Sequence, residues 1–306
     1  MPRYVLLRIL RGFLTLLAVV AVTFALGRAT GDPVALLLPQ GATVEDVLAM
    51  RARLGLDQPM LTQFGRYLSE IAQGEFGTSL VYNRPALDLI LERLPATLRL
   101  GLTSFLLAIM VGVPLGVLAA TGRGSGFDRF VRDVSLALQS LPSFFIGILG
   151  ILLFGVTLRW LPTFGDATPS HYVLPVVTMT LLPLALILRL VRASLLDVLS
   201  EDYVRTAHAK GLHRAWVVVR HALRNALIPV VTVLGLQLAS LIGGSVVIET
   251  VFAWPGVGSL AVEAIAGRDF PIVQAVVLLS SAAFVLINLL VDLSYALLDP
   301  RVEVTQ

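Results

Sequence analysis

The side chains that could carry out chemistry in this 306-residue chain are few, and their spacing excludes the common catalytic sites. The only lysine, Lys210, is preceded by alanine and followed by glycine, so the Gly-Lys-Ser/Thr sequence of a phosphate-binding P-loop is missing. The chain has no cysteine, which removes thiol nucleophiles, thiolate metal sites and disulfides. Of the four histidines, His171 stands alone, and His208, His213 and His221 share one polar segment without an HExxH pattern. We therefore expect no catalytic residue, metal or cofactor in this chain.

That polar segment, residues 200–229, is the most informative part of the chain, because it lies between two long apolar stretches. Seven basic side chains fall between Arg189 and Arg224. A basic amphipathic segment held at a membrane surface either docks a soluble partner or lies on anionic lipid headgroups. The residues alone leave both interpretations open.

The local pattern of this segment predicts helices separated by a glycine turn. Ser200 is expected to cap a helix that carries acids in its first turn and runs to Lys210, where Gly211 supplies a left-handed stop. Small residues of this helix, such as Thr206 and Ala207, are expected to face outward and permit close contact with a groove. A further helix is expected to bury an apolar stripe at i, i+4, i+7 and i+11, made of Leu212, Trp216, Val219 and Leu223.

The elements that position this segment are apolar helices. The chain is 57% hydrophobic and 14% charged, and six windows contain no charged residue. Because about 20 apolar residues cross a bilayer, these windows predict six transmembrane helices in an all-α integral membrane protein. We expect one transmembrane domain over residues 1–306. The windows are 12–27, 100–122, 134–158, 167–188, 225–248 and 270–291.

The distribution of arginine predicts the orientation of the helices. Three arginines precede span one, three lie between spans two and three, and the basic segment lies between spans four and five, whereas the short loops on the other side carry only Arg159 and Arg268. The positive-inside rule therefore places both termini and the 190–224 loop in the cytoplasm. The net charge of +3 then reflects topology, and it gives no support for binding nucleic acid.

The segment between spans one and two, residues 28–95, is expected to be external and helical. Thr43 is a cap for a first helix that ends at Gly55, a second follows from Met60 to about Gly74, and a third begins at Pro85. These helices either pack over the outer mouth of the protein or receive substrate from an external partner.

Polar side chains within the spans are candidates for the lining of a pathway, although Ser and Gln in membranes more often join helices by hydrogen bonds. An outer turn near span five contains aromatic and glycine residues, with Glu249 expected at the outer interface and Trp254 at headgroup level. The pathway candidates are Gln139, Ser140, Gln237, Ser240, Ser245 and Asn288, and the gate or outer-turn candidates are Glu249, Trp254, Pro255 and Gly256.

The polar segment resembles the cytoplasmic signature of permease subunits of bacterial ATP-binding-cassette (ABC) importers, EAA, three residues, G, nine residues, I-x-L-P. Aligned on Gly211, the chain lacks the Glu, the Ile and the final Pro. It has instead YVRTAxAKGL at 203–212 and HxLRNAxIPV at 221–230, the form of the dipeptide, oligopeptide, nickel and glutathione branch. The resemblance covers most of the chain, with GDP at 31–33, LGLDQP at 54–59, GEFGTS at 74–79, GGSVVIETVFAWPGVG at 243–258 and NLLVDLSYALLDPR at 288–301.

This resemblance implies the first of two nonidentical permease subunits in a bacterial inner membrane. The implied partners are a second homologous permease, two ABC ATPase subunits or a fused pair that bind ATP and magnesium, an extracytoplasmic substrate-binding protein, and lipid. By analogy, the cytoplasmic loop couples ATPase closure to the spans. The implied interface or loop-shaping residues are Tyr203, Arg205, Thr206, Ala207, Lys210, Gly211, His221, Arg224 and Asn225.

The resemblance implies an importer of short peptides, with glutathione or a nickel chelate as the alternatives. Without cysteine or a histidine cluster in the spans, a dedicated nickel site in this chain is not expected. A secondary transporter is the alternative of a different class. It would be expected to bury more ionisable residues at midplane and to show repeated halves, and neither is evident here.

Overall fold

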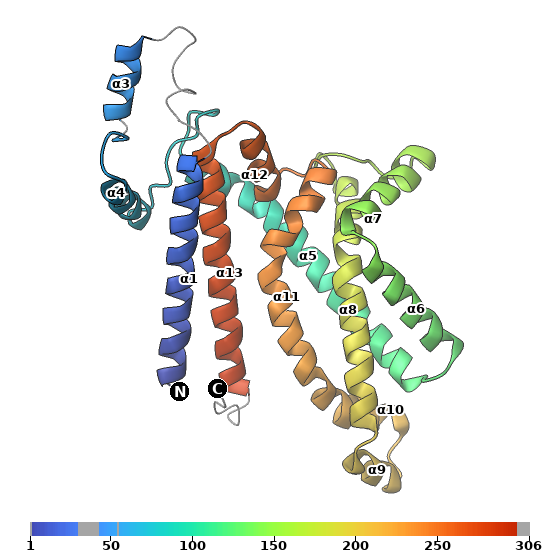
Figure 1. Cartoon of the computed structure of the whole chain (residues 1–306). Coiled ribbons are helices and arrows are strands. Elements are labelled where there is room, and N and C mark those ends of the chain that lie inside the picture. The colour runs from blue at the N-terminus through green and yellow to red at the C-terminus, as the bar shows by residue number, and fades with distance from the viewer. Residues whose placement is uncertain (1, 30–42, 54, 299–306) are drawn as a thin grey trace. The chain divides into compact units, whose positions relative to one another are not determined.

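The computed structural model describes residues 2–29, 43–53 and 55–298, and the regular elements in those ranges are all helical (Figure 1). The chain forms two compact units: the described residues of Met1–Pro95 with Ser259–Leu289 (unit 1), and those of Ala96–Gly258 with Leu290–Gln306 (unit 2). The α-helices are α1 (Pro2–Ala29), α3 (Val44–Arg53), α4 (Met60–Ala72), α5 (Ala86–Thr121), α6 (Gly126–Ser140), α7 (Ser143–Gly150), α8 (Val173–Leu199), α9 (Asp202–Ala209), α10 (Arg214–Trp216), α11 (Leu223–Val251), α12 (Val257–Ala266) and α13 (Phe270–Leu298). Two π-helical stretches, Ile151–Thr157 and Val217–Ala222, and a 3-10 turn, Pro169–Tyr172, complete the described elements.

Five helices are long and apolar enough to span a membrane, and a sixth candidate is a helix pair bent by 103°. The pair is Gly126–Ser140 with Ser143–Thr157, so the expected third span over 134–158 is a broken helix rather than one straight helix. The break lies at Pro142, which has no amide hydrogen for the helix ladder. Leu141 before it is extended (φ −100°, ψ 135°), as the residue preceding a proline tends to be. The straight candidates are Leu6–Arg28, Ala86–Thr121, Pro169–Leu199, Arg214–Leu238 and Phe270–Val291.

In unit 1, α1 and α13 run antiparallel (Figure 1). A Cβ atom on Gly12 would lie 2.8 Å from Val285, and one on Gly27 would lie 2.1 Å from Gln274, so glycine permits this close approach. Helix α4 packs against α1 through the ring of Phe24, whose centroid is 5.3 Å from that of Phe64. The expected helices α3 and α4 are confirmed.

In unit 1, one expectation is wrong and one buried residue was not predicted. The third outer helix is not separate, because Ala86 begins α5 and no break separates it from the second span. The segment before it is held by Asp269, which is completely buried and was missed in the sequence. Its carboxylate accepts hydrogen bonds from Ser79 Oγ at 2.5 Å, Leu80 N at 3.1 Å and Val81 N at 3.2 Å.

In unit 2, α5, α8 and α11 share an apolar core. Ala108, Ile187 and Val230 are each 0% exposed and belong to one apolar cluster. A Cβ atom on Gly116 of α5 would lie 2.8 Å from the carbonyl oxygen of Leu188, so the two helix backbones are in direct contact there. Dispersion contacts of this kind, rather than hydrophobic burial, hold membrane helices together.

A bidentate ion pair joins α6 to α8. Arg192 Nε lies 2.5 Å from Asp128 Oδ1, and Arg192 Nη2 lies 2.9 Å from Asp128 Oδ2, which also accepts from Gly124 N at 2.9 Å. The Asp128 side chain is only 3% exposed. Asp128 lies in the first turn of α6, and its backbone N–H donates to Ser125 Oγ, the N-cap of that helix. The ion pair therefore fixes the first turn of α6 to the end of α8 nearest α9.

Candidate functional site

The helix predicted within the polar segment is α9, which follows α8 directly (Figure 1). One face of α9 buries Val204 (1% exposed) and Ala207 (9% exposed) against Val217. Ala207 therefore faces inward, and the expectation that it points outward is wrong, because i, i+3 spacing places it on the same face as Val204. Ser200 is not the N-cap either. It ends α8, its hydroxyl donates to Asp197 O, and Glu201 occupies the N-cap position of α9.

The opposite face of α9 is exposed and polar. Asp202 lies in the first turn, where a carboxylate complements the helix dipole. Gly211 follows the helix with φ +77°, a conformation that favours glycine, and a Cβ atom there would meet nothing within 4 Å. Glycine is therefore favoured at position 211 by the positive φ of the backbone, and not by neighbouring atoms that would collide with a side chain. The exposed residues of this face and its end are Arg205, Thr206, His208, Ala209, Lys210 and Gly211.

The helix expected after Gly211 is continuous with α11. Arg214–Trp216 is one α-helical turn, Val217–Ala222 is π-helical, and α11 continues from Leu223. The π-helical stretch has i→i+5 hydrogen bonds, so the 3.6-residue period used for the prediction does not hold across it. Val217, Val218 and Ala222 are buried, whereas Leu212, Trp216 and Val219 of the predicted stripe are exposed.

Two side-chain contacts fix the polar segment to the rest of unit 2. Asn225 Nδ2 donates to Tyr203 Oη at 2.8 Å, which joins α9 to α11 and brings together two predicted site residues. Arg214 Nη2 donates to Thr121 O at 2.8 Å, so a cation lies at the C-terminal end of α5, where the helix dipole favours it. Arg214 was missed as a positioning residue, because nothing in the sequence distinguishes it from its basic neighbours. His221 and Arg224 are exposed.

This arrangement presents a short helix with an exposed polar face. In the described part of the chain, no group of three or more His, Cys, Asp or Glu side chains could hold a metal ion.

The pathway candidates of unit 2 are dispersed. Gln139 and Ser140 lie exposed at the end of α6, where Gln139 Oε1 accepts from Arg189 Nη1 at 2.9 Å. In α11, Gln237 is half-buried and Ser245 is buried. The side chain of Ser240 lies outside the described residues. Among the candidates that can be placed, only the sequence neighbours Gln139 and Ser140 lie together. In unit 1, Asn288 donates to the carbonyl oxygen of its own helix at Phe284, at 2.9 Å.

The outer-turn candidates of unit 2 form one buried network around Glu249. Glu249 is 0% exposed rather than at a surface, and its Oε1 accepts from Thr97 Oγ1 at 2.8 Å. The same hydroxyl accepts from Val257 N at 2.8 Å. A Cβ atom on Gly256 would lie 2.3 Å from the carboxylate, so glycine is required for this enclosure. The network ties α5 to the end of α11.

Trp254 is part of the same packing and is buried within unit 2. It is 6% exposed, its ring centroid lies 5.2 Å from that of Tyr172, and its Nε1 donates to Ala96 O at 3.1 Å. Pro255 beside it is half-buried. An aromatic ring with a satisfied polar atom packs well in a protein interior, and Trp254 does so here.

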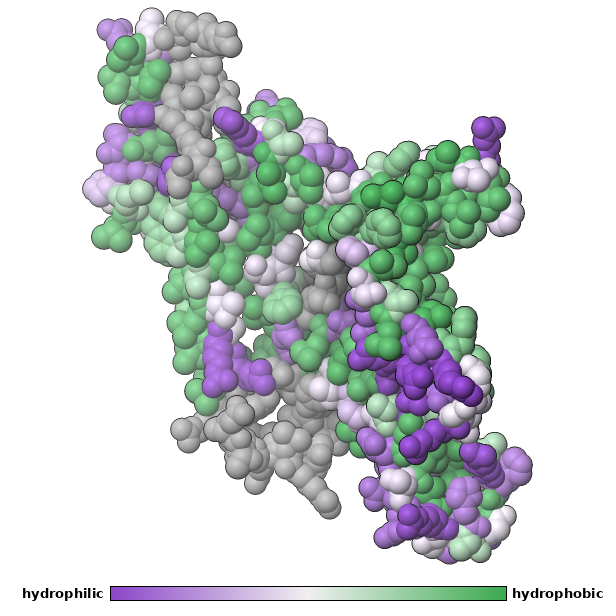
Figure 2. Space-filling model, turned by 45° about the vertical axis from the view of Figure 1, so that its right-hand side comes forward, coloured by the Kyte–Doolittle hydropathy of each residue, from purple (hydrophilic) through white to green (hydrophobic). Residues whose placement is uncertain are grey.

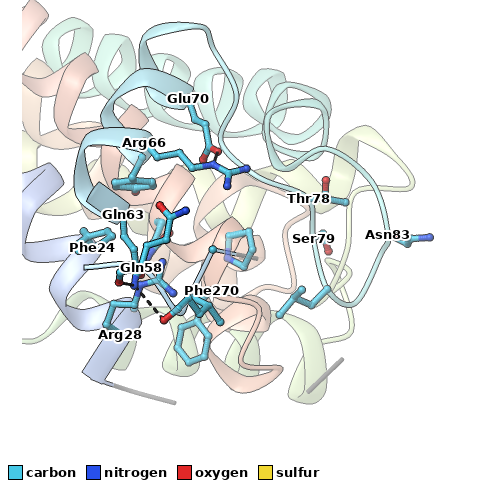
Figure 3. A pocket seen from close by; sticks show the side chains of 17 residues that line it. Phe24, Arg28, Gln58, Gln63, Arg66, Glu70, Thr78, Ser79, Asn83 and Phe270 are labelled. Atoms are coloured by element: carbon cyan, nitrogen blue, oxygen red, sulfur yellow. Dashed lines mark hydrogen bonds and ion pairs between the residues drawn. The ribbon is translucent and has the colours of Figure 1, made fainter. Parts of the chain in front are cut away.

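Unit 1 contains a cavity of about 570 Å³ that the sequence did not predict (Figure 3). It is lined by the end of α1, by α4, by the loop at 78–83 and by the start of α13. Gln63 Oε1 and Tyr67 Oη line it as buried polar atoms that make no hydrogen bond with the described residues. Burial raises the pKa of Tyr67 above its ordinary value.

The amino-acid sequence of the chain matches a known protein family and several of its members. Residues 112–304 match the family described as "Binding-protein-dependent transport system inner membrane component", and residues 1–101 match its N-terminal membrane component. The glutathione transport system permease protein GsiC of Salmonella paratyphi A is 44% identical over 304 residues, covering 99% of each chain. GsiC of Escherichia coli K12 has the same identity and coverage.

Solved structures share the fold at lower identity. A chain of the MetNI methionine ABC transporter in an inward-facing conformation superposes with a TM-score of 0.59 at 20% identity, covering 69% of this chain and 96% of that one. A chain of an amino acid ABC transporter solved with histidines gives 0.52 at 16% identity, covering 68% and 93%. The full-length family match and this shared fold confirm the resemblance drawn from the signature at 203–230. The chain therefore belongs to the binding-protein-dependent transport system inner membrane components, the permease subunits of ABC importers.

Proposed function

We propose that this permease forms half of the translocation pathway for short peptides, with glutathione the first substrate to test, and that α9 couples it to a partner ATPase. The observation that carries the coupling role is the division of α9 into two faces. Val204 and Ala207 anchor it on unit 2, and a polar face with a positive-φ glycine at its end is left exposed. Lipid binding would call for a broad apolar face turned outward, and on α9 the apolar residues Val204 and Ala207 are turned inward.

The proposed assembly contains a second homologous permease, two ABC ATPase subunits that bind ATP and magnesium, and an extracytoplasmic substrate-binding protein. Both termini and α9 lie on the cytoplasmic side in this proposal, which follows from the arginine distribution. The chain has no native cysteine, so this orientation can be tested with single cysteines. An impermeant maleimide should label Ser170→Cys from outside intact inner-membrane vesicles of native orientation, and Ala209→Cys only after permeabilisation.

The substrate proposal rests on the GsiC relatives, whose name specifies glutathione, a tripeptide. A thermal-shift screen of the cognate binding protein with glutathione, dipeptides, longer peptides and a nickel chelate would test it. Stabilisation by glutathione or a peptide is expected. A screen in which all peptides fail and the nickel chelate succeeds would overturn the peptide assignment.

The docking proposal is tested with Gly211→Val in the complex reconstituted with its ATPases and binding protein. A β-branched residue at φ +77° is strained by about 1–2 kcal/mol, which distorts the end of α9. We expect loss of both ATPase co-purification and peptide uptake. Gly165→Val is the matched control, because Gly165 has φ +86° and equally open surroundings but precedes the other end of α8.

A second variant separates docking from backbone strain. Ala209→Trp adds bulk to the exposed face of α9 without requiring a positive φ, and it should weaken ATPase binding as Gly211→Val does. If both variants retained coupled transport, α9 would not be the docking element.

A further inference from the structure

Arg189 carries a charge within the span formed by α8, and it is exposed in this chain. It lies ten residues before the end of α8 at Leu199, which corresponds to about 15 Å of helix. Ionisable side chains within a membrane span are costly, and they face a bundle interior, a water-filled cavity or a partner rather than lipid. Arg189 therefore requires a polar environment or an anion.

The neighbouring Arg192 shows what is unusual about Arg189. Arg192 is neutralised by the buried carboxylate of Asp128. Arg189, by contrast, has the neutral amide oxygen of Gln139 as its only hydrogen-bond partner among the described residues. A guanidinium group has five N–H donors, so most of those of Arg189 are available to another acceptor.

The two arginines also point in opposite directions along α6. Gln139 lies eleven residues beyond Asp128 in that helix, which is about 16 Å at 1.5 Å per residue. Arg192 thus reaches toward the loop at 122–125, and Arg189 reaches away from it, deeper into the span. An arginine near a helix end would normally snorkel toward the headgroups, and Gln139 holds Arg189 in the other direction.

The exposed stripe of α8 that carries Arg189 continues toward the C-terminal end of that helix. Along the same stripe of α8, Ala193 and Asp197 are exposed at i+4 and i+8. In Figure 2, hydrophilic residues gather over the lower right of the molecule, below the hydrophobic band at the level of α7. The stripe thus carries a charged residue at each end, Arg189 and Asp197, with only the small side chain of Ala193 between them, and it fits a face turned toward an aqueous path.

We propose that Arg189, oriented by Gln139, is an anion subsite that binds a carboxylate of the transported peptide during translocation. Short peptides and glutathione carry a free carboxylate, and a guanidinium group binds carboxylates bidentately. This inference rests on the proposed transport of peptides.

The test compares uptake of a short peptide with uptake of the same peptide as its C-terminal amide. The complete complex is reconstituted in proteoliposomes, with a peptide pair chosen so that both forms saturate the binding protein. Arg189→Gln should lower uptake of the free acid by roughly tenfold or more, the range for loss of a charged hydrogen bond, and change uptake of the amide by less than about twofold. Arg189→Lys should be intermediate, because lysine keeps the charge without the bidentate geometry.

Arg132→Gln is the matched control. Arg132 is an exposed arginine of α6 that pairs with Asp133 at 3.4 Å, and its loss should leave both uptake rates unchanged. Equal loss of acid and amide uptake in Arg189→Gln would overturn the subsite and indicate an ion pair with the second permease. Unchanged acid uptake would overturn it as well. A wild-type complex that took up neither peptide form would instead refute the proposed function.

Discussion

Replacing Asp128 with asparagine should destabilise unit 2 strongly, because Asp128 and Arg192 form a buried ion pair between α6 and α8. The Asp128 side chain is 3% exposed and accepts three hydrogen bonds, two of them from the guanidinium group. Breaking a buried pair by removing one partner costs about 3–5 kcal/mol. Arg192 is 20% exposed and can regain some water, and asparagine retains one acceptor oxygen. We therefore expect a loss of about 2–4 kcal/mol in the free energy of unfolding.

Asp133→Asn on the same helix is the control. Its pair with Arg132 is longer, at 3.4 Å, and the two side chains are 68% and 48% exposed. Exposed pairs contribute about 0–1 kcal/mol, since water and salt screen them. The difference between the two asparagine variants isolates the effect of burial from the effect of losing a charge on α6.

Unfolding of the purified permease in mixed micelles, titrated with sodium dodecyl sulfate and followed by tryptophan fluorescence, would measure these changes. All three tryptophans, at 160, 216 and 254, belong to unit 2, so the signal reports on the unit that contains the pair. A double-mutant cycle with Arg192→Gln should give a coupling energy of about 1.5–3 kcal/mol. An Asp128→Asn variant as stable as Asp133→Asn, with coupling near zero, would refute the reasoning.

Three further outcomes are expected. Gly116→Val should lower the free energy of unfolding by about 1–3 kcal/mol, because it overpacks α5 against α8. Gly65→Ala, whose Cβ meets nothing within 4 Å, should raise the free energy of unfolding by about 0.5–1 kcal/mol in α4. Thermal unfolding measures both changes, and similar effects of the two variants would contradict the packing. Tyr67→Phe should change stability by less than about 1 kcal/mol, because the buried hydroxyl makes no well-formed hydrogen bond and has only the nearby Thr23 side chain as a weak partner. A clear loss in the same melts would show that the contact with Thr23 is a full hydrogen bond. Hydrogen bonds from Thr43 hold the pKa of Asp46 below its ordinary value of 3.8. The stabilisation of α3 by this cap is therefore complete above pH 3.8 and is lost as the pH falls through the lower pKa of the folded state. Carboxyl-carbon NMR should show a low titration midpoint for Asp46, and Thr43→Ala should raise that midpoint.

The amino-acid sequence determined the class of the protein and the position of its main elements. Uncharged windows of about 20 residues have few alternatives to membrane helices, so their number and approximate limits follow from length and composition. Gly211 marked the end of α9, and Thr43 marked the start of α3, because caps and left-handed turns depend on local residue chemistry. The signature at 203–230 identified the family before any comparison.

Only the tertiary structure decided which face of each element is buried and which distant residues meet. The inward position of Ala207 depends on Val217, whose register is set by a π-helical stretch that no 3.6-residue pattern reveals. Glu249 is enclosed because Thr97, more than 150 residues away, provides its hydrogen bond. Arg189 and Gln139 are 50 residues apart, and a charge count assigns Arg189 to a cytoplasmic loop. Local sequence encodes helix formation, whereas burial and hydrogen-bond pairing depend on the three-dimensional approach of helices that are remote in the chain.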